Sequence, residues 1–112
     1  MKRPWAFICA SESATSKHLR NYCREVYLLG YLPVCPKLQD SQYLVLEDAV
    51  ERSEYTAIVR DKLLRCPMLV VCSRNQDATT NAQIGLAQKY SRIVTTLDGL
   101  KKAVSEGDDL VS

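Results

Sequence analysis

Residues 68–72, Met-Leu-Val-Val-Cys, form an apolar run rich in β-branched side chains between Pro67 and Ser73. A short continuous apolar run bounded by turn residues is typical of a strand that is buried on both faces of a parallel sheet. The run Trp5–Ala10 has the same character and ends at the polar residues 11–13. Two such strands indicate an α/β fold.

Segments with helical periodicity separate the strands. The first helix is expected to begin at a cap, Ser13 or Thr15, and to end at Gly30, where a left-handed C-terminal cap fits. A second helical pattern covers Tyr43–Arg65, and Ser53 is a residue at which it can break into two helices. The remaining expectations are an irregular segment over 37–42, helices over 80–90 and 98–105, and strands over 31–35 and 93–95. Pro33 has no N–H to donate, so the strand over 31–35 is expected at an edge of the sheet.

This order, β-α-β-α-α-β-α-β-α, predicts a three-layer sandwich with a four-stranded parallel sheet of the flavodoxin or Rossmann-like type. The 112 residues leave room for one domain, expected over 1–105, followed by an acidic tail over 106–112 that frays. Ligands of such sheets bind beyond the carboxyl ends of the strands, near the switch in strand order. The expected site therefore lies in loops 11–15, 36–42 and 73–81.

Composition excludes several classes of protein. The net charge of +2 is mild and the charged residues are interspersed, so nucleic acid is not an expected partner. The apolar stretch that begins at Trp5 ends at Ala10, too short for a membrane span or a signal peptide, and we expect a cytoplasmic protein. Five cysteines without a C-x-x-C pair and a single histidine, His18, predict buried thiols, no metal and no cofactor.

Two of the strand-end loops are rich in hydrogen-bonding side chains. Residues 11–16, Ser-Glu-Ser-Ala-Thr-Ser, lead into a helix, where free N–H groups can cradle a phosphate or a sugar. The same hydroxyls can equally serve only as helix caps, and the loop lacks the glycines of the dinucleotide and P-loop fingerprints. Residues 73–81 carry amides and hydroxyls suited to a ribose or a base, and Arg74 there either pairs with a phosphate or is solvated.

Three stretches carry a family resemblance: Phe7–Ser11, Tyr22–Pro36 with its Gly30-Tyr31 turn, and Leu63–Val71 followed by Asn81–Ala87. Together they resemble the nucleoside 2-deoxyribosyltransferase-like superfamily, above all its small members from bacteria and their phages. The resemblance covers residues 7–95. It implies an α/β domain whose last matched helix carries the nucleophile.

The departures from the family pattern concern the acids. Active members carry a glutamate in a Glu-(Leu/Ile)-Gly-x-Ala setting, and here Gln83 stands in that position. A neutral amide forms no glycosyl-enzyme ester and does not stabilise an oxocarbenium ion by charge. Pro67 stands where the family often has an acid before the third strand. Val59 aligns with a helix aspartate of the active enzymes, and Asp61 lies two residues from that position. Thr80-Asn81 replaces the glycines that are usual in the family before the nucleophile. Deoxyribosyl transfer is therefore not expected.

The first function hypothesis is a non-catalytic domain that binds a nucleotide, a nucleoside or a related small molecule. Its predicted ligand-binding residues are Ala10, Ser11, Glu12, Ser13, Lys37, Ser73, Asp77, Thr80, Asn81 and Gln83. No catalytic residue is predicted.

Two alternatives remain open. One is a protein-interaction or inhibitor module of phage or mobile-element origin, for which six tyrosines (Tyr22, Tyr27, Tyr31, Tyr43, Tyr55 and Tyr90) offer interface anchors. The other is a residual deoxyribosyltransferase or N-glycosidase that uses Glu12, Asp77 or Asp40. The resemblance also implies a homodimer in which one protomer completes the cleft of the other.

Overall fold

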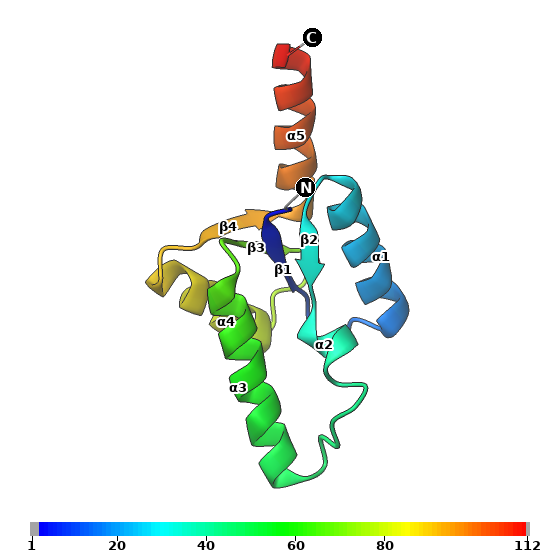
Figure 1. Ribbon diagram of the computed structural model, residues 1–112, viewed down its shortest axis with the longest axis vertical. Coiled ribbons are helices and arrows are strands. Elements are labelled where there is room, and N and C mark those ends of the chain that lie inside the picture. The colour runs from blue at the N-terminus through cyan, green and yellow to red at the C-terminus, as the bar shows by residue number, and fades with distance from the viewer. Residues whose placement is uncertain (1–2, 112) are drawn as a thin grey trace.

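The computed structural model describes residues 3–111, and side chains as far as residue 106. The elements are β1 (Trp5–Cys9), α1 (Ser16–Leu28), β2 (Leu32–Val34), α2 (Pro36–Gln39), α3 (Ala49–Arg65), β3 (Met68–Val71), α4 (Ala78–Lys89), β4 (Ile93–Thr96) and α5 (Leu97–Val111). Figure 1 shows their arrangement around the sheet.

The four strands form one parallel sheet in the order β2-β1-β3-β4. This confirms the predicted fold class, and it places the switch in strand order between β1 and β3. The predicted edge position of β2 is also confirmed, with Pro33 paired opposite Ala6. Proline is tolerated there because only one side of an edge strand has a partner.

Alternation along the central strands builds the three layers. Ala6 and Ile8 of β1 pack with α1 and α5 on one face of the sheet. Phe7 and Cys9, which point the other way, pack with Leu63 of α3 and with α4 on the opposite face. Because successive strand side chains alternate between faces, each central strand contributes to both cores.

The segment between β2 and β3 differs from its prediction. Residues 36–39, expected to be irregular, form the short helix α2, which begins with proline in its first turn. The long helix α3 begins at Ala49, because the Asp48 carboxylate accepts the Val50 N–H and caps it, and it continues through Ser53 without a break. The segment between β2 and β3 thus contains two helices, but they are α2 and α3 and not two halves of the helical pattern over residues 43–65.

The last helix is longer than predicted. It was expected to end near Ser105, yet its backbone stays helical to Val111 and projects away from the sheet (Figure 1). Residues 106–112 contain no proline, the residue that most strongly breaks a helix. Ser112 and the side chains of 107–112, part of the predicted frayed tail, lie outside the described residues. Within residues 3–111, no helix is long and apolar enough to cross a membrane.

We expect Leu69→Ala to lower the free energy of unfolding by about 2–5 kcal/mol, because it removes a fully buried side chain from the central strand β3 and leaves a cavity. Urea unfolding followed by circular dichroism measures the loss. Leu28→Ala is the matched control, since this side chain on α1 is 64% exposed and should change stability by less than about 0.5 kcal/mol. Equal losses in the two variants would contradict the packing described here.

Candidate functional site

The loops after β1 and β3 meet at the switch point, as the strand order requires. The Cys72 N–H donates to the Cys9 carbonyl at 2.9 Å, which extends the β1–β3 ladder. Beyond it, the Ser11 N–H donates to Ser73 Oγ at 2.8 Å and the Glu12 N–H to Asp77 Oδ2 at 2.7 Å. These bonds join the two loops and position Glu12.

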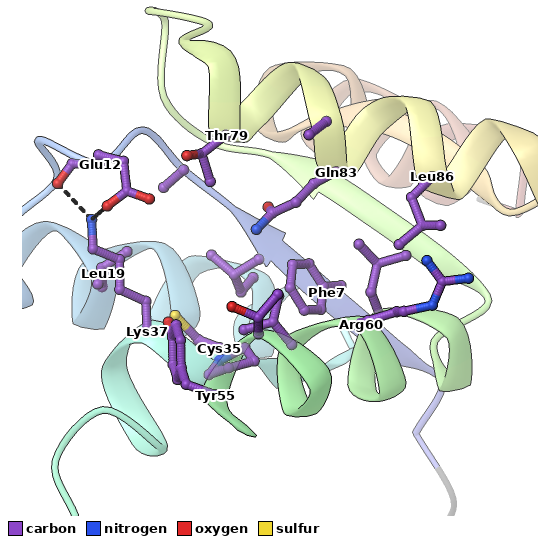
Figure 2. Close-up of a pocket in the computed structure, with 17 residues that line it drawn as sticks. Phe7, Glu12, Leu19, Cys35, Lys37, Tyr55, Arg60, Thr79, Gln83 and Leu86 are labelled. Carbon is purple, nitrogen blue, oxygen red and sulfur yellow. Dashed lines mark hydrogen bonds and ion pairs between the residues drawn. The ribbon is translucent and has the colours of Figure 1, made fainter. Parts of the chain in front are cut away.

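A cavity of about 550 Å³ opens beside this junction, between α3 and α4 and over β1 (Figure 2). Its size lies within the range of small-molecule sites. The lining residues are Phe7, Ile8, Ala10, Glu12, Leu19, Cys35, Pro36, Lys37, Tyr55, Thr56, Val59, Arg60, Leu63, Thr79, Ala82, Gln83 and Leu86. Most of this lining is apolar, with a few polar side chains interspersed.

Gln83 lies in the middle of the cavity, on α4. Figure 2 shows its amide pointing inward toward Phe7, with Thr79 and Leu86 on the same helix. Spacings of four and three residues place Thr79, Gln83 and Leu86 on one face of a helix. The amide offers both a donor and an acceptor to any molecule in the cavity.

The positions where family members carry acids are not all in the cavity. Val59 lines the cavity from α3, and Gln83 lines it from α4. Pro67 instead lies at the amino end of β3, where its carbonyl accepts the Ile93 N–H at 3.0 Å, and it is not a lining residue. Only two of the three replaced acids would therefore have faced a ligand here.

Glu12 and Lys37 form one end of the cavity. Lys37 Nζ donates to the Glu12 carbonyl at 2.6 Å and to the Ser11 carbonyl at 3.1 Å, and it lies 3.9 Å from the Glu12 carboxylate. The ammonium thereby ties α2 to the loop after β1. Glu12 is the one acid among the lining residues in the described part of the chain.

The ten predicted ligand-binding residues separate into groups. Ala10, Glu12, Lys37 and Gln83 line the large cavity. The serines Ser11, Ser13 and Ser73 line a second hollow of about 200 Å³ beside α1, together with His18 and Arg74. The other three predicted residues line neither: Asp77 caps α4, Thr80 is fully buried, and Asn81 is exposed.

Sequence reasoning missed the wall contributed by α3. Tyr55, Val59 and Leu63 recur at spacings of four residues, an apolar stripe that indicates the inward face of α3. The stripe does turn inward, but toward the cavity along much of its length, with Thr56 and Arg60 beside it. Periodicity marks the inward face of a helix and does not distinguish a packed core from a cavity.

Asp40, a candidate acid, belongs to a different cluster. Its carboxylate is buried, with 4% of the residue exposed, and it accepts bonds from Lys62 Nζ at 2.6 Å and the Tyr43 hydroxyl at 2.5 Å. Burial raises the pKa of Asp40, but these two bonds outweigh it and hold the pKa below its usual value. The cluster joins the end of α2 to α3 and does not line the cavity.

The thiols show no sign of metal binding. No three His, Cys, Asp or Glu side chains come together as metal ligands in the part of the chain that the structure describes. Burial raises the pKa of Cys9 and of Cys72 to about 12, which keeps both protonated at neutral pH.

Neither a protein-family model nor a curated protein matches the sequence. The similarity to the nucleoside 2-deoxyribosyltransferase-like superfamily therefore stays a prediction.

We expect Asp40→Asn to lower the free energy of unfolding by about 1.5–3 kcal/mol at neutral pH, because the Lys62 bond loses its ionised acceptor. A carboxylate whose folded pKa is lowered stabilises the fold above its unfolded pKa, and this contribution disappears as the pH falls through the folded pKa. The difference between wild type and variant should therefore shrink in acid. Urea unfolding of both proteins between neutral and acid pH measures it, and a difference independent of pH would contradict the ion pair.

Proposed function

We propose that this protein binds a nucleoside, a nucleotide or a related small molecule in the cavity between α3 and α4 and does not cleave it. The observation that carries the proposal is the position of Gln83, whose neutral amide points into the middle of an open cavity of about 550 Å³. A glutamine there keeps hydrogen-bonding capacity and lacks the charge that glycosidic cleavage needs.

Three features favour binding. The cavity wall includes the half-buried apolar side chains of Val59 and Leu86, against which the apolar face of a ligand can pack. Hydroxyls of Tyr55 and Thr79 and the amide of Gln83 give it a few polar groups for orientation. The loops after β1 and β3 are joined by hydrogen bonds from the Ser11 and Glu12 N–H groups to the Ser73 and Asp77 side chains, so the Glu12 end of the cavity is preformed.

Three acids are candidates for a catalytic role in cleavage, and each already has a partner within the protein. Glu12 is held beside the Lys37 ammonium, and Asp40 is bonded to Lys62 outside the cavity. Asp77 accepts the N–H groups of Glu12 and Thr80, which hold its pKa below its usual value and keep it from acting as an acid. Retaining glycosidases need two carboxyl groups about 5 Å apart, and the lining residues supply only Glu12.

We expect calorimetry with a panel of nucleosides and nucleotides to show binding, and Gln83→Leu to weaken it about tenfold, the effect of losing one to two hydrogen bonds of about 1 kcal/mol each. Leucine fills a similar volume, so the variant isolates the amide. The matched control is Gln88→Leu on the exposed side of the same helix, which should leave the affinity unchanged.

Two results would overturn this proposal. One is the absence of both binding heat and a shift in melting temperature across the whole panel with the wild-type protein. The other is release of a free base from a deoxynucleoside in an assay where Glu12→Gln abolishes the release, which would make the protein a glycosidase.

A second candidate function, protein interaction, is favoured by an apolar surface at the start of α3. Tyr43 and Val50 are 64% and 65% exposed, and Val45 between them is also exposed. Exposed apolar side chains gathered on one segment are typical of interfaces. The partner that we propose is a second copy of the chain, the homodimer that the family resemblance implies.

We expect light scattering after size exclusion to give the mass of a dimer for the wild-type protein and of a monomer for Val50→Glu, since a buried, unpaired carboxylate opposes association. Leu28→Glu, an equally exposed apolar residue on α1, should remain dimeric. A monomeric wild-type protein, or dissociation by Leu28→Glu alone, would contradict this interface.

A further inference from the structure

The loop after β1 is poorly suited to an anion, although its place before α1 predicted a phosphate cradle. Its N–H groups are already used: Ser11 donates to Ser73 Oγ and Glu12 donates to the Asp77 carboxylate. A phosphate at this end would lie beside the Glu12 carboxylate, which lines the cavity, and near Asp77, whose carboxylate accepts the Glu12 N–H. Lys37 is the one lining cation there, and its ammonium is already bonded to two loop carbonyls and paired with Glu12. A phosphate and a carboxylate are both negative and repel one another, so the phosphate of a ligand is better placed at another part of the cavity.

The opposite end of the cavity carries a cation without an acidic partner. Figure 2 shows the Arg60 guanidinium beyond Phe7 and beside Leu86, at the far end from Glu12. Arg60 Nη2 donates to the Tyr90 hydroxyl at 3.2 Å. Among the described residues, no carboxylate lies within ion-pair distance of Arg60.

Tyr90, the hydrogen-bond partner of Arg60, lies close to two further cations, Lys89 and Arg92. Lys89 Nζ and Arg60 Cζ each lie 5.8 Å from the centre of its ring. Arg92 donates from Nη1 to the Tyr90 carbonyl at 3.1 Å. The acid next to Arg60 in sequence, Asp61, is paired with Arg65 at 3.1 Å. The Arg60 guanidinium therefore belongs to a group of cations around Tyr90, and the acid beside it in sequence is already paired.

We propose that Arg60 binds the phosphate of a phosphorylated nucleoside, so that the ligand enters with its phosphate at the Arg60 end and its ring beside Val59 and Gln83. The ligand class is then a nucleoside monophosphate rather than a free nucleoside. A guanidinium presents several donors in a plane and binds phosphate in a bidentate manner. The nucleoside part of this inference rests on the proposed function, and the phosphate part rests on Arg60 alone.

Calorimetry with thymidine and thymidine 5′-monophosphate, extended to the other three deoxynucleoside pairs, tests the assignment. In the wild-type protein one monophosphate should bind at least about tenfold more tightly than its nucleoside, a difference of 1.4 kcal/mol. Arg60→Gln should remove this difference and leave the affinity for the nucleoside within about twofold. Arg52→Gln, two turns earlier on α3 and outside the cavity lining, should change neither affinity.

Inorganic phosphate separates this inference from the proposed function. It should raise the melting temperature of the wild-type and Arg52→Gln proteins but not that of Arg60→Gln. Binding of nucleosides with no preference for monophosphates, or a preference that survives Arg60→Gln, overturns the role of Arg60 and leaves the proposed function standing. A phosphate response that depends on Arg60, without binding of any nucleoside or nucleotide, retains the anion site and overturns the proposed function.

Discussion

The pairing of β1 with β3 is the constraint on which the rest of this structure depends. Both strands are apolar throughout and buried on both faces, so they pair centrally and each directs side chains into two cores. Their carboxyl ends then meet at the point where the strand order reverses, and the following loops are bonded to each other through Ser11, Glu12, Ser73 and Asp77. From there the chain continues into α1 on one face of the sheet and into α4 on the other.

The cavity follows from how α3 and α4 lie over the sheet. Leu63 and Ala87 bring the two helices onto the layer formed by Phe7 and Leu69. Toward the carboxyl ends of the strands, the space between the helices is left open and is lined by Gln83 and other side chains of both. Leu63 packs in this core and also lines the cavity, as Leu86 does on α4, so the same faces of the two helices supply both core packing and cavity walls.

Charge is distributed unevenly around this cavity, which bears on what it can hold. Glu12 is compensated by Lys37, and the nearby Asp77 is occupied by backbone N–H groups. Arg60 at the other end has no acidic partner within ion-pair distance among the described residues. With a neutral Gln83 in the middle, the cavity presents hydrogen-bonding groups and the positive charge of Arg60.

The sequence by itself determined the parallel sheet and the edge position of β2. These follow from local properties: apolar runs, the missing N–H of Pro33, and the alternation of strands with helices. Only the tertiary structure decided that Gln83 and Arg60 share a cavity while Ser11 and Ser73 line another hollow. A helical period of 3.6 residues shows which side chains turn inward, but whether they meet another side chain or an open space depends on the neighbouring helix, whose position is set by contacts between residues far apart in the chain.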